Sequence, residues 1–420
     1  MRLPTALMLT LCLLLAGAGP RASAQIALPP VQLPELPPLP RIGERPLIDL
    51  DRTLGRLRLD RVTALLREHP DAVELDRDDQ PAVRGILVAA GVDAAMIARA
   101  ASEGFALESR ERIEGLDLDI ARFRVPDGRS LARAQKQLAK LLPEAEVDAD
   151  NLYFASGSGG TAGAVLSTAA LAAAAPGRAS LGLIDGGVAA HPSVAGRVEQ
   201  RGFARGAPSP SRHGTAVASL LIGEGTVRGA APGARLLAAD VYGADPAGGN
   251  ASAIARALGW FVQRGAAVVT ISLVGPDNKL LALAIRRAQG RGLLIVAAVG
   301  NDGPAAPAAY PAAYAGVLGV TGVDAKGHVL PEAGRAAQVD FAAPGDAVLA
   351  ATGAASTDRL RGTSFAAPLV AGRLARLYPA PAVGRIDPAI RALVAEARDL
   401  GKKGRDKQTG YGLICGDCGR

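Results

Sequence analysis

Apolar and polar positions change period several times between residues 83 and 154. Alternating or continuous apolar segments predict β-strands at 84–90, 105–113, 118–125 and 146–154. Apolar residues recur at helical spacing in 93–103, where Asp93 is the expected N-cap, and in 130–142. The order strand, helix, strand, strand, helix, strand predicts a small α+β ferredoxin-like unit.

Residues 47–69 interleave charged and apolar positions and predict one amphipathic helix. Its apolar positions are Leu54, Leu57, Val62, Leu65 and Leu66. Before it, proline recurs at nearly every second or third position of 28–40, which predicts an extended, semi-rigid leader.

The larger C-terminal part of the chain joins short apolar runs to helical segments, which predicts an α/β fold. The run 181–184 ends in Asp185, and the run 293–299 is followed by Gly300 and Asn301. Two other segments begin with polar residues near His213 and Ser364 and then become apolar at helical spacing. In an open α/β sheet, functional groups collect at the carboxyl ends of the strands.

Four of these polar residues supply the chemistry of a nucleophilic serine. Ser364 follows a Gly-Thr turn and precedes the apolar run 365–371, so its hydroxyl is expected at a helix start beside unpaired backbone N–H groups. A lone serine there is more commonly a helix cap. His213 adds a base, Asp185 a carboxylate that orients it, and Asn301 an amide donor for an oxyanion. Together they predict serine catalysis.

These segments resemble those of the subtilisin-like serine peptidases, the subtilases, over residues 181–414. The most specific matches are the His213-Gly214-Thr215 block and residues 362–368; other matching segments are 229–234, 270–273, 310–312, 341–345 and 410–414. The resemblance implies a doubly wound, mostly parallel sheet with helices on both faces. It also implies a serine endopeptidase that acts on polypeptides through an acyl-enzyme. Asp185 would orient His213, His213 would be base and then acid, Ser364 would attack, and Asn301 would stabilise the oxyanion.

The same resemblance implies where a substrate binds. An extended peptide would pair with the edge formed by Ser272, Leu273, Val274 and Gly275, and the cleft would be lined by Ala297, Ala298, Val299 and Gly300. Three positions depart from the family pattern. Gly186 stands where Thr or Ser is usual, which predicts looser support of Asp185. Val274 and Val299 replace smaller residues, which predicts a narrower pocket.

Two other functional classes compete with a peptidase. A catalytically silent peptide-binding protein on the same fold is the alternative, with its chemistry lost through the changes at Gly186 and Val299. An α/β-hydrolase esterase requires the order Ser, Asp, His and a Gly-x-Ser-x-Gly turn. Ala366 occupies the position of the second glycine, and the chain order differs, so this class is excluded.

The N-terminal unit resembles the inhibitory propeptide domain that precedes many subtilases. Such a domain would assist folding of the catalytic domain, and its tail at 151–157 would fill the cleft. We expect autocleavage between about 154 and 162, the alternative being a permanent accessory domain. The predicted domains are a signal peptide (1–24), a Pro-rich leader (25–46), a helical segment (47–82), the ferredoxin-like prodomain (83–156), a Gly/Ala-rich linker (157–178), the catalytic domain (179–414) and a C-x-x-C tail (415–420).

The first 24 residues have the pattern of a secretory signal. Arg2 precedes an apolar stretch at 6–16, and Ala22-Ser23-Ala24 forms a small-residue cleavage site before Gln25. No later segment offers about 18 unbroken apolar residues. We therefore expect a secreted or periplasmic protein without a membrane partner once the signal is removed.

Charge is distributed unequally between the two parts of the chain. The formal net charge of +7 divides into 27 Lys and Arg against 17 Asp and Glu in residues 155–420, and 20 against 23 in residues 1–154. The arginines are scattered and not interleaved with aromatic residues, which argues against a nucleic-acid partner. We expect a monomer whose basic catalytic domain attracts an acidic partner on the same chain.

Metal sites and the remaining reactive side chains are less informative. Cys415 and Cys418 are expected to form a small disulfide loop, with free thiols as the alternative, because zinc would need two more ligands. Calcium is possible by family resemblance, but no run of oxygen ligands appears near Asp240 and Asp245, so no metal site is predicted. His191, before Pro192, is expected to be a solvent-exposed structural histidine.

Overall fold

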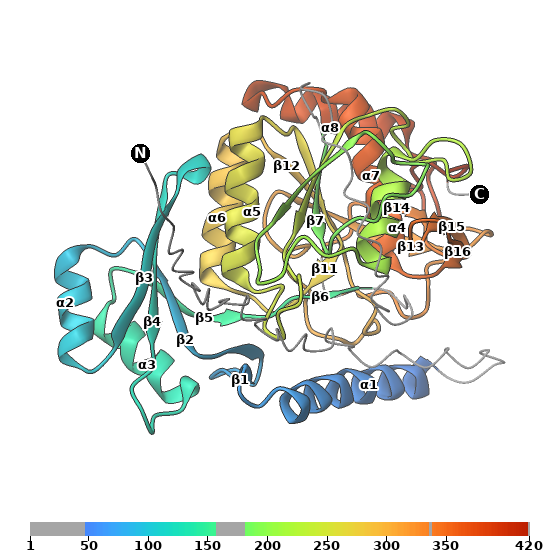
Figure 1. The fold of residues 1–420 in the computed structure, drawn as a ribbon. Helices are drawn as coiled ribbons and strands as arrows, with labels where there is room; N and C mark the ends of the chain where they lie inside the picture. Colours follow the sequence, from blue (N-terminus) through green and yellow to red (C-terminus); the bar gives the residue numbers. More distant parts are fainter. Residues whose placement is uncertain (1–46, 157–180, 336–337, 419–420) are drawn as a thin grey trace, which may run out of the picture.

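The computed structural model describes residues 47–156, 181–335 and 338–418, which form a small N-terminal unit and a larger unit (Figure 1). The N-terminal unit, residues 73–151, is built on one antiparallel sheet. Its strands are β1 (Val73–Leu75), β2 (Pro81–Ala90), β3 (Ala106–Ile113), β4 (Leu118–Arg124) and β5 (Glu146–Asn151). They lie in the order β1-β2-β4-β3, with β5 on the other side of β2. This is the predicted ferredoxin-like arrangement, extended by the hairpin strand β1.

Two helices cover the outer face of this sheet, and a 3-10 turn (Glu114–Leu116) links β3 to β4. Helix α2 (Ala94–Ser102) begins at the predicted cap, because Asp93 accepts a hydrogen bond from the backbone N–H of Met96 at 2.8 Å. Helix α3 (Leu131–Leu141) buries the predicted stripe of Leu131, Ala134 and Leu138. The apolar spacing of the sequence therefore accounts for both helices and for the face that each presents to the sheet.

The larger unit is built around a seven-stranded parallel sheet. Its strand order among the described residues is β14-β13-β12-β10-β7-β9-β8. The strands are β7 (Leu181–Asp185), β8 (Val198–Gly202), β9 (Leu236–Asp240), β10 (Val268–Ile271), β12 (Leu294–Ala298), β13 (Val317–Val323) and β14 (Phe341–Pro344). Two short antiparallel pairs lie outside it, β6 (Phe154–Ala155) with β11 (Leu273–Val274) and β15 (Val348–Ala351) with β16 (Thr357–Leu360).

Helices cover both faces of the parallel sheet, as predicted for a doubly wound fold. Helices α4 (Arg212–Ile222), α7 (Thr363–Leu377) and α8 (Ile386–Glu396) contribute to one core, and α5 (Ala251–Arg264) and α6 (Lys279–Gly290) to the other. The 3-10 turn Val383–Arg385 precedes α8. Successive strand residues point to opposite faces, so Val296 enters the first core and Ile295 the second. None of the described helices is long and apolar enough to cross a membrane.

The two units pack closely against each other. The second face of the N-terminal sheet packs on α5 and α6, with Ile113, Leu116 and Ile120 in the same core as the helix residues. The backbones approach so closely that a β-carbon on Gly115 would lie 2.0 Å from the carbonyl oxygen of Gly259. Helix α1 (Leu47–Glu68) confirms the predicted amphipathic helix and extends beneath the larger unit, on the side where β6 and β11 lie (Figure 1).

Candidate active site

Asp185 and His213 meet at the carboxyl end of the parallel sheet. Asp185 is the last residue of β7 and is 1% exposed, and His213 lies in the first turn of α4. The Nδ1 atom of His213 lies 2.8 Å from Oδ2 and 3.0 Å from Oδ1 of Asp185. A buried carboxylate at this distance fixes the imidazole with its Nε2 atom turned away from the aspartate.

Ser364 lies in the first turn of α7, is completely buried and contacts Ser156. Its neighbour Phe365 packs on His213, with ring centroids 5.5 Å apart. The Ser364 hydroxyl is not hydrogen-bonded to His213. It donates to the carbonyl oxygen of Ser272 at 3.1 Å and lies 2.7 Å from Oγ of Ser156. The Nε2 atom of His213 has no hydrogen-bond partner among the described residues.

Asn301 follows β12 and faces the start of α7. Its Oδ1 atom accepts a hydrogen bond from the backbone N–H of Thr363 at 3.0 Å, which fixes the amide orientation. Its Nδ2 atom is buried and has no partner among the described residues. The backbone N–H of Ser364 donates to the carbonyl oxygen of Ser156 at 3.1 Å. An unpaired buried donor is costly, so the free Nδ2 indicates a position built to receive an oxygen.

Residues 153–156 lie in the cleft as an extended strand. Ala155 pairs with Leu273 and Phe154 with Val274, in the antiparallel pair of β6 and β11. The strand continues through Ser156, whose backbone N–H donates to the carbonyl oxygen of Ser272 at 3.1 Å. Of the predicted peptide-binding edge, Ser272, Leu273 and Val274 therefore contact this strand through their backbone.

Tyr153 anchors the other end of the strand. Its side chain is completely buried, and its hydroxyl donates to the carbonyl oxygen of Pro276 at 2.8 Å. The fourth edge residue, Gly275, makes room for it, because a β-carbon there would lie 2.5 Å from the Tyr153 ring. On the opposite side, Tyr153 is held by a hydrogen bond from its N–H to the carbonyl oxygen of Gly249 at 2.9 Å and by the hydroxyl of Tyr242 at 2.8 Å.

A cavity of about 160 Å³ lies beside this strand. Of the predicted cleft residues, Val274, Gly275, Val299 and Gly300 line it. Gly300 lies near Val274, because a β-carbon added at Gly300 would lie 3.5 Å from Cγ1 of Val274. Ala297 and Ala298 are buried within β12, contribute to the two cores and do not line the cavity. Val274 and Val299, which are predicted to narrow the pocket, thus form part of the cavity wall.

Gly186 has a local explanation in this chain. Its backbone N–H donates to Oδ1 of Asp185 at 2.7 Å, so the carboxylate keeps support from this residue. A β-carbon on Gly186 would lie 2.4 Å from Oγ of Ser211, the residue that caps α4. Ser211 therefore fills the space that a larger residue 186 would need, and the predicted loosening of Asp185 is not evident in this hydrogen-bond pattern.

The expectation that His191 is exposed is wrong. His191 is 5% exposed, and its Nδ1 atom lies 2.8 Å from Oγ of Ser193. Burial lowers the pKa of His191, which favours the neutral ring. The loop turns back at this point, where the N–H of Val194 donates to the carbonyl oxygen of His191 at 3.0 Å, and the neighbouring Pro192 alone did not reveal that.

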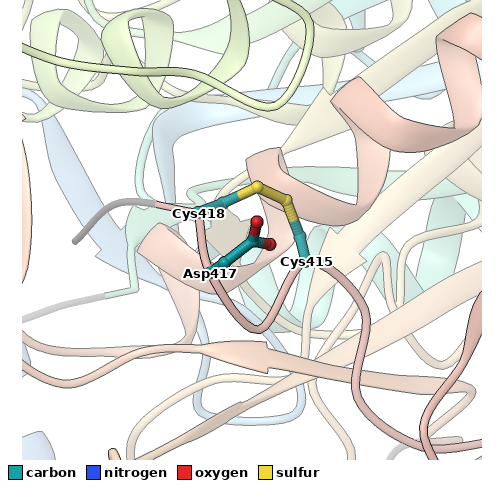
Figure 2. Close-up of side chains that lie close together, drawn as sticks. All are labelled: Cys415, Asp417 and Cys418. Atoms are coloured by element: carbon teal, nitrogen blue, oxygen red, sulfur yellow. A yellow bond between two sulfur atoms is a disulfide. The ribbon is translucent and has the colours of Figure 1, made fainter.

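Possible metal ligands gather at one place among the described residues, Cys415, Asp417 and Cys418 (Figure 2). Cys415 and Cys418 form a disulfide, as predicted, so their sulfur atoms are not thiolates. Asp240 is held by the backbone N–H groups of Ser209, Tyr242 and Gly243 at 2.6 to 2.9 Å. Burial raises the pKa of Asp240. This carboxylate orders a loop of the cleft through hydrogen bonds to the protein.

Two residues of this region were not singled out from the sequence. Tyr242 lies in a loop after β9, and nothing in its sequence surroundings distinguishes it from a core aromatic residue. Asp302 follows Asn301 and lines the cavity together with Arg58 and Arg61 of α1. The hydrogen bond between Arg61 and Asp302 joins positions 241 residues apart in the sequence, which no local pattern reveals.

Known proteins similar to this chain include proteases of several bacteria. The family model of the subtilases matches residues 178–412. This range nearly coincides with residues 181–414, whose sequence motifs resemble that family. The chain is 32% identical over 251 residues to the minor extracellular protease Epr of Bacillus subtilis, which is 56% of this chain and 37% of Epr. It is 36% identical over 200 residues to subtilisin BL of Lederbergia lenta, which is 46% of this chain and 73% of that protein.

Solved structures extend the likeness in fold beyond the parallel sheet. Fervidolysin from Fervidobacterium pennivorans aligns with a TM-score of 0.62 and 19% identity, over 82% of this chain and 62% of that one. The epidermin leader peptide processing protease of Staphylococcus aureus aligns with a TM-score of 0.59 and 16% identity, over 79% and 96%. These two show the fold, and the family match covers more than half of the sequence. The chain belongs to the subtilase family, the subtilisin-like serine peptidases.

Proposed function

We propose that the protein is a serine endopeptidase made as a self-inhibited precursor, with Asp185, His213, Ser364 and Asn301 as its catalytic residues. One observation carries this proposal: residues 153–156 pair with β11 while the carbonyl oxygen of Ser156 accepts the backbone N–H of Ser364. A substrate presents its scissile carbonyl in this way, next to the nucleophile and its donors.

The proton transfers follow from the position of Nε2 of His213, which has no hydrogen-bond partner among the described residues. Ser364 Oγ attacks the carbonyl carbon after it turns from the Ser272 carbonyl toward Nε2 of His213, which accepts its proton. Asp185 holds Nδ1 of the ring and stabilises the imidazolium that forms. His213 then gives the proton to the leaving amine, and the bond between carbonyl and nitrogen breaks to leave an acyl-enzyme. A water molecule repeats the sequence and releases the acid.

The developing negative charge on the carbonyl oxygen needs two donors. The backbone N–H of Ser364 is one, and it already contacts the carbonyl oxygen of Ser156. The unpaired Nδ2 of Asn301 is the other, held in position by the bond from Thr363 to its Oδ1 atom. Loss of one such donor typically lowers the rate by a factor of about 100 to 1000.

We further propose that the first bond cut is the one after Ser156, within the range 154–162 expected from the sequence. The N-terminal unit is then the inhibitory prodomain, and residues 153–156 remain in the cleft as a product until it leaves. Tyr153 holds this tail through a completely buried side chain, and Tyr242 and Gly249 hold its backbone. The processed chain would begin at Gly157.

A Ser364→Ala precursor tests the catalytic assignment. We expect it to stay at full length after purification, whereas the unchanged protein and a Ser102→Ala control on the exposed surface of α2 are cut to a product that begins at Gly157. Normal trimming of the Ser364→Ala protein in the absence of other proteases would show that another enzyme makes the cut.

A fluorophosphonate probe separates the peptidase from the silent peptide-binding protein. Fluorophosphonates form a covalent bond to a serine that a neighbouring base has activated. Covalent labelling of the processed protein, mapped to Ser364, supports the enzyme. A processed protein that binds peptides and refuses the probe supports the binding protein.

Export is the third part of the proposal and rests on residues 1–24, which lie outside the described residues. The charged start, the apolar stretch and Ala22-Ser23-Ala24 support removal of a signal peptide before Gln25. Amino-terminal sequencing of the Ser364→Ala precursor from the periplasm or medium checks this: the expected first residue is Gln25, and retention of Met1 in the cytoplasm would contradict it.

A further inference from the structure

Helix α1 packs on a part of the larger unit that neither the tail (residues 153–156) nor the N-terminal sheet covers. Its apolar stripe is buried at both ends, with Leu54 and Leu65 each 2% exposed. Leu65 packs in a small cluster with Val73 and Leu152, next to the N-terminal unit. Leu54 lies at the other end of the helix, against the larger unit. The helix thus bridges the two units.

The contact at the Leu54 end is with the loop directly after Asn301. A β-carbon on Gly303 would lie 3.1 Å from Cδ1 of Leu54 and 2.8 Å from Oδ1 of Asp51, so the helix packs on the bare backbone of the loop. Asp302 faces the same helix. Its Oδ1 atom lies 2.5 Å from Nη2 of Arg61, and its Oδ2 atom 3.9 Å from Nε of Arg58.

These contacts place α1 along the cavity beside the tail. Arg58, Arg61 and Val62 of α1 contribute to its lining, opposite Val299 and Gly300. The tail does not fill this space, because Phe154 and Ala155 line the cavity and the residue before the proposed cut is the small Ser156. Helix α1 forms part of the wall of the cavity, while the tail blocks the backbone-pairing edge.

We propose that the surface formed by Asp302, Gly303 and the cavity mouth is a second inhibitor-binding site, and that α1 is its occupant. The proposal rests on the proposed function, because it concerns the cleft of the same peptidase. The helix keeps the cut N-terminal segment bound to the enzyme after the bond following Ser156 is broken. Replacing Arg58 and Arg61 weakens this contact without changing the tail or the catalytic residues.

The retention is measured on the full-length protein in two time courses. Gel analysis follows the cut after Ser156, and fluorophosphonate labelling of Ser364 follows the opening of the cleft. We expect the double variant Arg58→Ala/Arg61→Ala to be cut at the normal rate but to become labelled sooner, with the lag between the two events shortened about tenfold. The matched control is Arg52→Ala/Arg56→Ala, two exposed arginines on the same helix, which should keep the normal lag.

A charge-exchange experiment distinguishes loss of the ion pair between Arg61 and Asp302 from a general effect on folding. Arg61→Asp alone should shorten the lag, and adding Asp302→Arg should restore it, because the exchanged pair regains its attraction. An unchanged lag in the double alanine variant, or an equal change in the control, would overturn the proposal. Absence of cutting and labelling in every protein, including the unchanged one, would refute the proposed function, and this inference would fall with it.

Discussion

At the scale of single residues, a glycine in the site leaves room for the side chain of a neighbouring residue. Gly186 leaves room for the hydroxyl of Ser211, which accepts the backbone N–H of Gly214 at 2.9 Å and so caps the helix that carries His213. Gly186, which follows Asp185, and Ser211, the cap of the helix that carries His213, therefore share one volume. The departure from the family pattern at Gly186 is therefore explained by its packing against Ser211.

We predict that Gly186→Ala destabilises the protein, because its β-carbon would lie 2.4 Å from Oγ of Ser211. Overpacking of this kind typically costs about 1–3 kcal/mol. Ser211→Gly should restore most of the loss in the double variant, since glycine is nearly as good a cap. Denaturant unfolding of the four proteins, all carrying Ser364→Ala, checks this. Additive losses in the double variant would contradict the shared volume.

A second prediction concerns the carboxylate of Asp302. If α1 leaves with the cut N-terminal segment, as proposed, Asp302 loses Arg58 and Arg61 and remains at the edge of the cavity. We expect the processed enzyme to cut peptides with Arg or Lys before the scissile bond faster than the same peptides with Glu, and Asp302→Asn to reduce that ratio about tenfold. Cleavage rates of matched peptides measure it. An unaltered ratio would show that Asp302 does not contact the substrate.

The sequence predicted the positions of Asp185, His213 and Asn301, because each stands where an apolar run changes to polar residues at the end of a strand or the start of a helix. The contacts of Ser364 could not be predicted in the same way. Its hydroxyl bonds to Ser156 and to the Ser272 carbonyl, and these partners lie 208 and 92 residues away in the sequence. Local patterns locate a functional group, whereas its hydrogen-bond partner depends on the assembled chain.

At the scale of elements, a helix of one unit is capped by a strand of the other. The backbone N–H of Lys279, the first residue of α6, donates to Oδ2 of Asp148 in β5 at 2.9 Å. Asn278, the cap of α6, donates from Nδ2 to the carbonyl oxygen of Ala149 at 2.8 Å. Helix α6 therefore begins against the N-terminal sheet, and the orphan N–H group of Lys279 depends on that sheet being present.

We predict that Asp148 makes the precursor less stable as the pH rises. Burial raises the pKa of Asp148 to about 6, despite hydrogen bonds from the N–H groups of Lys279 and Ala149. Because this folded-state pKa lies above the ordinary value, the stabilising protonation is complete below about pH 4 and is lost as the pH rises through 6. Relative to Asp148→Asn, the unchanged side chain should lose up to about 3 kcal/mol between pH 4 and 7.

Urea unfolding of Ser364→Ala precursors at several pH values measures this difference, with the exposed Asp127→Asn as control. Other carboxylates titrate equally in all three proteins, so only the difference between variants is informative. Curves that remain parallel for Asp148→Asn and the unchanged side chain would show that Asp148 does not titrate in this range.

Elements with clear periodicity were predicted closely, and the shortest ones were not. The stripe from Leu131 to Leu142 predicted α3, and Asp93 marked the start of α2. The strand expected at 146–154 divides in two, because β5 ends at Asn151 and β6 begins at Phe154 to pair with β11 in the other unit. A pairing of two residues between units leaves no periodic signal, and neither does the three-residue strand β1.

At the scale of the whole molecule, the two units complement each other in charge and in shape. Glu111 and Glu146 of the N-terminal unit pair with Arg256 and Lys279 of the larger unit, at 3.1 and 3.7 Å. These pairs agree with the predicted attraction between an acidic and a basic part of the chain. They are partly exposed and contribute little energy each, so the apolar contact around Gly115 has the larger part in holding the units together.

The parallel sheet of the larger unit joins strands distant in sequence, a topology that folds slowly. The N-terminal unit contributes to its cores and caps α6, so we predict that adding residues 25–156 speeds the refolding of a separate 157–420 chain carrying Ser364→Ala by at least about 100-fold. Gly115→Ala should abolish the acceleration, because its β-carbon would collide with the Gly259 carbonyl, whereas Gly55→Ala, with open space around it, should not. Recovery of the native far-ultraviolet circular dichroism signal over time measures the rate. Equal acceleration by the Gly115 and Gly55 variants would mean that docking on α5 is not what guides folding.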